Sequence, residues 1–144
     1  MNVLLAYRVH GPKRALRRLL MRLPYVRVVG EASAGRGAIR LARRSPPAVA
    51  VIGSTLTGPG CLETVRTIKT IRPQTQFIVL TVRHTQAYVR AARRSGASYC
   101  LPVRTVDVRL PSLLVLAYRD YLAVTARSVK RPRRGRRAPR APVD

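Results

Sequence analysis

The acidic residues of this sequence are few, and this limits the chemistry that the chain can perform. General acid–base catalysis and divalent-metal binding both rely on carboxylates that lie close together. Only five acids occur among the 144 residues: Glu31, Glu63, Asp107, Asp120 and Asp144. Because they form no cluster, the sequence predicts a protein that acts by binding and is not an enzyme.

The histidines and cysteines add no further site. His10 and His84 have no acid or thiol at a suitable spacing, so they predict neither a metal site nor a catalytic triad, and we expect both to be solvated. Cys61 and Cys100 form no metal-binding spacing and no disulfide framework. Cys61 lies near a predicted helix start, which could lower its pKa, whereas Cys100 is expected to be buried. Phosphate-binding glycine signatures are absent from the sequence, so we expect neither a metal nor a cofactor.

The charge of the chain is unusual. It has 29 basic and 5 acidic residues, a net charge of +24. Residues 127–144 hold eight of the basic residues and one acid, so the remainder of the chain is basic as well. Such a surface favours nucleic acid, anionic lipid or an acidic protein as a partner. Only 3 of the 29 are lysine, and a compositional bias of the genome toward arginine codons is an equally good source of the charge.

Short apolar runs alternate with amphipathic ones along the chain. Apolar runs are typical of strands, and a recurrence of apolar residues every three or four positions is typical of helices. The predicted strands are residues 3–6, 26–32, 48–52, 77–80 and 98–101. The predicted helices are residues 13–23, 36–44, 62–71, 86–95 and 113–126, the fourth ended by Gly96 and the last entered through Pro111 and Ser112.

This alternation predicts the fold. Strands without internal polar alternation suit a parallel sheet that is buried on both faces. Strands that alternate with helices predict right-handed βαβ units. We therefore expect a three-layer α/β domain, a (βα)₅ flavodoxin-like fold with strand order 2-1-3-4-5, over residues 1–126. Ligands of such sheets bind at the carboxyl ends of the strands. Residues 127–144 are expected to form a basic, disordered tail.

Several stretches of the sequence together resemble one family. They are residues 3–6, 28–32, 58–63, 77–81, 87–89 and 96–98, which occur in the right order and at the right spacing. In these stretches the chain resembles the receiver domain of bacterial two-component response regulators of the NarL/LuxR type, over about residues 2–126. The resemblance implies a role in phosphorelay signal transduction.

The functional positions of that family carry different residues here. Receiver domains bind Mg²⁺ through two acids after the first strand and accept a phosphoryl group on an aspartate that ends the third strand. A serine or threonine and a lysine after the fourth and fifth strands contact the phosphate. These positions fall on Tyr7, Arg8, Gly53, Thr81 and Val103, or on Pro102 in place of Val103 if the last loop is shifted by one residue. Only Thr81 keeps the residue type, so the resemblance implies a degenerate receiver without a phosphoacceptor.

Arg8 has two interpretations. Its guanidinium stays charged and could occupy the space of the metal ion, or it could point into solvent.

Two binding functions follow from this reading. In the family, the face formed by the fourth helix, the fifth strand and the fifth helix, which correspond here to residues 86–95, 98–101 and 113–126, carries dimerisation and output contacts. Here it would include Tyr88, Arg90, Arg94, Tyr118 and Tyr121, and it would bind a signalling or regulatory protein or a second copy of the chain without phosphorylation. A role in transcription regulation would fit such a protein.

The alternative is sequence-independent binding of DNA or RNA, by the basic helix faces and by the tail. The tail residues are Lys130, Arg131, Arg133, Arg134, Arg136 and Arg137. No apolar run is long enough to span a membrane, and we expect a cytoplasmic protein without a membrane partner.

Overall fold

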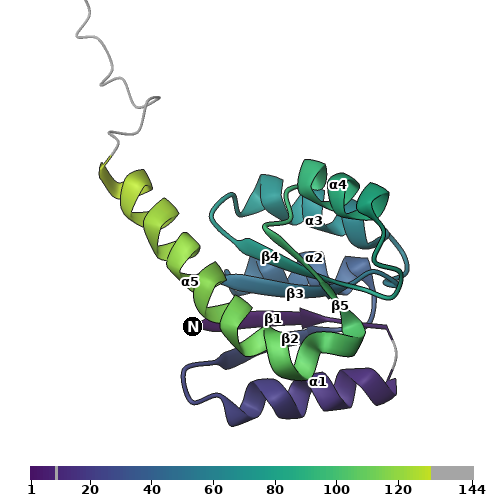
Figure 1. Ribbon diagram of the computed structural model, residues 1–144. Helices are drawn as coiled ribbons and strands as arrows, with labels where there is room; N and C mark the ends of the chain where they lie inside the picture. Colours follow the sequence, from purple (N-terminus) through teal and green to yellow (C-terminus); the bar gives the residue numbers. More distant parts are fainter. Residues whose placement is uncertain (9, 131–144) are drawn as a thin grey trace, which may run out of the picture.

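The structure, a computed structural model, describes residues 1–8 and 10–130. A five-stranded parallel sheet lies between two layers of helices (Figure 1). The strands are β1 (Asn2–Ala6), β2 (Arg27–Ala32), β3 (Val49–Gly53), β4 (Gln76–Thr81) and β5 (Tyr99–Pro102). The helices are α1 (His10–Arg22), α2 (Gly35–Arg44), α3 (Cys61–Ile71), α4 (Gln86–Ser95), a short 3₁₀ turn η1 (Val103–Thr105) and α5 (Val106–Lys130). The strand order is β2-β1-β3-β4-β5, which confirms the predicted topology.

Alternate residues of each strand pack into two separate cores. In β1, Val3 and Leu5 lie in the core beneath α1 and α5, whereas Leu4 lies in the core beneath α2, α3 and α4. All five residues of β3 and all six of β4 are buried. Burial on both faces explains why these strands are apolar without alternation.

The last helix differs most from the prediction. α5 begins at Val106 and ends at Lys130, whereas the sequence predicted residues 113–126. Pro111 was interpreted as a helix entry, but it lies within the helix, where it removes one backbone hydrogen bond. Val106 and Leu110, which precede the proline, are buried on the same side as Leu114. Their burial stabilises the early turns, and this is the reason the helix starts upstream of the proline.

The other helices end close to the predicted residues. α4 spans the predicted residues 86–95, and Gly96 caps it with a φ of 115°, a conformation that favours glycine. α1 begins three residues earlier than predicted, because Pro12 is accepted in a first helical turn. Residues 127–130 belong to α5, although the sequence assigned them to the tail. No helix of the described ranges is both long and apolar enough to cross a membrane.

Candidate functional site

The carboxyl edge of the sheet brings together three of the predicted site positions. Because β1, β3 and β4 are parallel neighbours, their last residues meet at this edge. Tyr7 directly follows β1, Gly53 ends β3 and Thr81 ends β4. The backbone N–H of Tyr7 donates to the carbonyl oxygen of Ala32, 3.0 Å away, so the tyrosine is fixed at the edge.

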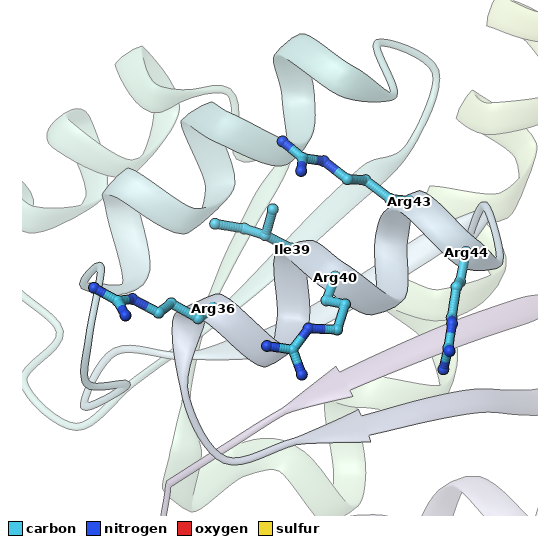
Figure 2. A pocket seen from close by; sticks show the side chains of 5 residues that line it. All are labelled: Arg36, Ile39, Arg40, Arg43 and Arg44. Atoms are coloured by element: carbon cyan, nitrogen blue, oxygen red, sulfur yellow. The ribbon is translucent and has the colours of Figure 1, made fainter.

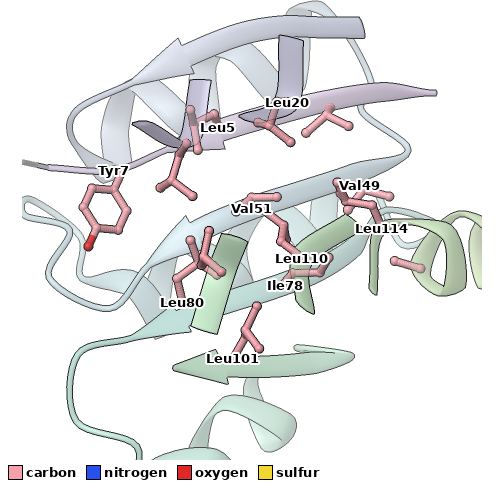
Figure 3. Packing of buried hydrophobic residues seen from close by; sticks show 14 of the residues in the cluster. Leu5, Tyr7, Leu20, Val49, Val51, Ile78, Leu80, Leu101, Leu110 and Leu114 are labelled. Carbon is pink, nitrogen blue, oxygen red and sulfur yellow. The ribbon is translucent and has the colours of Figure 1, made fainter. Parts of the chain in front are cut away.

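The ring of Tyr7 fills the space next to Gly53. A Cβ atom on residue 53 would lie 2.5 Å from Cδ2 and 2.7 Å from Cε2 of Tyr7, distances that atoms in van der Waals contact do not reach. The side chain of Tyr7 is only 3% exposed and belongs to the core beneath α1 and α5 (Figure 3). Position 53 therefore accommodates glycine and no larger residue while the ring remains in place.

The environment of Tyr7 is apolar. Burial raises the pKa of the Tyr7 phenol, because the phenolate would lose its hydration. The ring is therefore uncharged at neutral pH. Arg8, the next residue, has an exposed side chain, so the structure agrees with the solvent-facing interpretation of this arginine.

Thr81 is buried, at 1% exposure, and its hydroxyl has partners within the protein. Its Oγ1 lies 2.9 Å from Nδ1 of His84 and 3.5 Å from the carbonyl oxygen of Leu101. The sequence analysis predicted that His84 is a solvated loop residue, and it did not predict this hydrogen bond. The three-residue separation of a hydroxyl and an imidazole was the available signal.

A neighbouring contact joins the loops that follow β3 and β4. The backbone N–H of Val82 donates to Oγ of Ser54 at 3.1 Å, and the N–H of Ser54 donates to the carbonyl oxygen of Leu80 at 2.8 Å. Ser54 is thus engaged with the protein itself, whereas the buried Oγ1 of Thr55 has no hydrogen-bond partner among the described residues.

The fifth position also lacks a charge. Val103 lies in η1 and packs, half-buried, against the core beneath α5, while Pro102 pairs with Thr81 in the sheet. Neither residue supplies an ammonium group at this edge.

The residues at the edge do not fit the Mg²⁺ ion that the receiver fold implies. Magnesium prefers oxygen ligands that include one or two carboxylates. Tyr7, Arg8 and Gly53 offer none, and the ring occupies the space beside Gly53. Within residues 1–8 and 10–130, no three His, Cys, Asp or Glu side chains gather as metal ligands would. Glu31 lies on β2, where its Oε1 is 3.5 Å from Nε of Arg17.

The tyrosines of the predicted partner face lie in two separate clusters. Arg90 and Arg94 are exposed on α4, and Tyr118 and Tyr121 stack on α5 with ring centroids 6.0 Å apart. Tyr88 packs instead in the core beneath α2, α3 and α4, where burial and the Cys61 thiol raise its pKa. The structure thus groups the α5 tyrosines and places Tyr88 in a different cluster.

Other features of α5 were missed by the sequence reasoning. The Tyr99 hydroxyl on β5 donates to Oδ2 of Asp120 at 2.6 Å, which ties β5 to α5. Exposed apolar side chains follow one another along the outside of the helix: Val108, Val115, Leu116 and Leu122. The seven-residue spacing of Val108, Val115 and Leu122 was a readable signal, because it places them on one face of a helix.

Predictions were also made for the cysteines and for the basic tail. Burial raises the pKa of the Cys61 thiol to about 11, so the predicted lowering is wrong. Cys100 is half-buried, and burial raises its pKa as well. Lys130 ends α5, and the remaining predicted nucleic-acid residues of the tail, from Arg131 to Arg137, lie outside the described residues.

Comparisons with known proteins identify the fold. No protein-family model matches the chain, and no curated protein matches it. Among solved structures, a two-component response regulator of the LuxR family from an Aurantimonas species matches with a TM-score of 0.76 and 24% identity, over 87% of this chain and 96% of that one. The response regulator domain of CheB from Thermotoga maritima matches with a TM-score of 0.72 and 20% identity, over 85% and 96%.

A DNA-binding response regulator of the LuxR family from Staphylococcus aureus has a TM-score of 0.76 and 14% identity, over 81% of this chain and 98% of that one. At these identities the similarity shows the fold. The chain has the flavodoxin-like fold of response-regulator receiver domains.

Proposed function

We propose that this protein is a receiver-fold signalling module of the two-component type that acts through protein–protein contacts and without phosphoryl transfer. The observation that carries the proposal is the ring of Tyr7, which occupies the space beside Gly53 and is tightly buried there. An acidic site at this edge would need a side chain on residue 53 and carboxylates near it. The proposal includes no catalytic activity.

The partner surface in this proposal is formed by α5, with α4 and β5 beside it. Val108 is 82% exposed, and Val115 and Leu122 continue the same face. Aromatic, apolar and arginine side chains are the types enriched where proteins bind each other, and α5 offers all of them. The partner is a regulatory protein or a second copy of this chain, and transcription regulation is the process that we propose for the pair.

The test is exposure of the intact protein to a small-molecule phosphodonor in the presence of Mg²⁺. We expect the mass of the protein to stay unchanged, because position 53 offers no carboxylate to accept the group and no carboxylates lie beside it to hold Mg²⁺. A receiver domain that keeps a free phosphoacceptor aspartate, treated in parallel, shows that the donor is active. Covalent phosphate on Ser54 or Thr55, the hydroxyls nearest to Gly53 in the sequence, would overturn the proposal.

A second measurement tests the partner surface. Val115→Lys and Leu122→Lys place charges on the exposed apolar face of α5, and the complex with the partner, or the dimer, should weaken at least tenfold. Met21→Lys is the matched control, since Met21 is also exposed but lies on α1. Equal affinity of all variants would contradict the role of α5.

A further inference from the structure

The second helix has an outward face made almost entirely of arginine. Arg36, Arg40, Arg43 and Arg44 are all exposed, and we call these four the α2 arginine face. They surround the half-buried Ile39 in a shallow depression of about 440 Å³. Figure 2 shows Arg36 and Arg43 extending to the side of Ile39, and Arg40 and Arg44 to the opposite side. With a rise of about 1.5 Å per residue, the charges span roughly 12 Å along the axis.

The position of this face is fixed by tight packing of the helix beneath it. Ala38 and Ala42 are completely buried against the sheet. A Cβ atom on Gly35 would lie 2.2 Å from the carbonyl oxygen of Pro59 and 2.4 Å from Oγ1 of Thr64, so the start of α2 lies directly against the loop before α3. Arg72 donates from Nε to the Ala42 carbonyl and from Nη2 to the Arg43 carbonyl, which holds the end of the helix. The charges are therefore presented on a rigid element.

No acid among residues 1–8 and 10–130 neutralises these charges. The ion pair found in this part of the chain joins Arg17 on α1 to Glu31 on β2. Arg43 and Arg44 lie in the last turn of α2, where a cation is favourable. Arg36 lies in the first turn, where the helix dipole disfavours a cation, and Arg72 adds a fifth positive charge nearby. The cluster is electrostatically unfavourable by itself, and an anion would relieve it.

The chemistry of the face selects among anionic partners. None of the large exposed apolar side chains lies on α2, whereas a helix that binds a membrane surface buries an apolar face. Arginine is common at protein–protein interfaces, but there it surrounds an apolar or aromatic centre, and α2 exposes no large apolar side chain that could form one. Guanidinium groups bind phosphate oxygens in a bidentate manner. The face also lacks aromatic side chains on which unpaired bases could stack.

We propose that the α2 arginine face binds the phosphate backbone of a nucleic-acid duplex without reading its sequence. This binding is independent of the proposed signalling function, because it uses a different surface from α5. Each phosphate that an arginine neutralises releases counterions, so the binding weakens steeply with salt.

The test uses the full chain and a fluorescent duplex of random sequence, with anisotropy measured across a salt series. In Arg36→Gln/Arg40→Gln/Arg43→Gln, the slope of log K against log salt should fall by about 2.7, or 0.9 per phosphate. The affinity at ~50 mM salt should fall at least tenfold. The matched control is Arg14→Gln/Arg18→Gln/Arg22→Gln, which removes the same charge from the exposed side of α1. The control should keep the slope and stay within about twofold in affinity.

Several outcomes would overturn the proposal. Absence of binding by the unmodified protein at ~50 mM salt is one, because electrostatic binding is strongest there. An equal loss in the α1 control would show that only total charge matters. If only the variant Arg131→Gln/Arg133→Gln/Arg134→Gln lost affinity for the duplex, the binding site would lie in residues 127–144 and not on α2. Tighter binding to phosphatidylserine vesicles or to a polyglutamate peptide than to the duplex would identify another partner class.

Discussion

The carboxyl edge of the sheet is closed by an uncharged ring, whereas the outer face of α2 is open and carries arginines that pair with no acid in the part of the chain that the structure describes. At the edge, Tyr7 packs onto Gly53, and Thr81 is engaged with His84 and Leu101. On α2, four guanidinium groups point into solvent around Ile39. The contrast teaches that a fold's usual ligand site need not be the site at which a particular chain with that fold binds a ligand.

The largest effect is expected from placing the same acid in both regions. Gly53→Asp would force a side chain into the ring of Tyr7 and bury a carboxylate, and we expect a loss of about 3–5 kcal/mol in the free energy of unfolding. Arg40→Asp, on the open face, should change it by less than about 0.5 kcal/mol. Urea denaturation of both variants measures the difference. Equal free energies of unfolding for the two variants would contradict the conclusion that the carboxyl edge is closed and the face of α2 is open.

A double-mutant cycle sharpens the cause of that loss. Gly53→Ala alone should destabilise the protein by about 1–3 kcal/mol, because its Cβ meets the ring. In a Tyr7→Ala background the same change should cost almost nothing, since the space is then empty. The coupling free energy from the four proteins should be at least ~1 kcal/mol. Additive effects would mean that the ring does not determine the residue at position 53.

The smallest effect is a dependence of stability on pH that comes from the buried phenol of Tyr7. Burial raises the pKa of Tyr7 above its ordinary value of 10.0, so the folded state holds its proton more tightly than the unfolded state does. The stabilisation that results from this difference in proton binding is fully present below pH 10, and it is lost as the pH rises through the raised pKa of Tyr7. Tyr7→Phe should therefore lose less stability than the unmodified protein between pH 9 and pH 11. Parallel curves for the two proteins would contradict this assignment.

The sequence predicted the layers and the strand order because both depend on apolar periodicity. Val49–Gly53 and Gln76–Thr81 are buried on both faces, and such runs are legible without a structure. The start of α5 was predicted too late, because the local preference of Pro111 was outweighed by the burial of Val106 and Leu110. Local preference alone does not report that kind of tertiary packing.

The candidate sites were only partly predictable. The positions at the carboxyl edge followed from the resemblance to receiver domains, carried over residue by residue, but such a correspondence does not show which side chain fills the space. The contact of Tyr7 with Gly53 depends on the direction of one ring across two strands. Tyr88 was assigned to a partner surface by its residue type, whereas its side chain packs, partly buried, against the core beneath α2, α3 and α4. The arginines of α2 were read as part of a general charge, and their concentration on one rigid face emerged only from the fold.

The mutual dependence of Tyr7 and Gly53 also constrains how the protein can change over generations. An acid at position 53 is opposed while the aromatic ring is present, and loss of the ring first leaves a hole in the core. Each single step therefore lowers stability, and an acid can be introduced at position 53 only through a less stable intermediate. A lineage that has adopted this pair is held in it by its own packing.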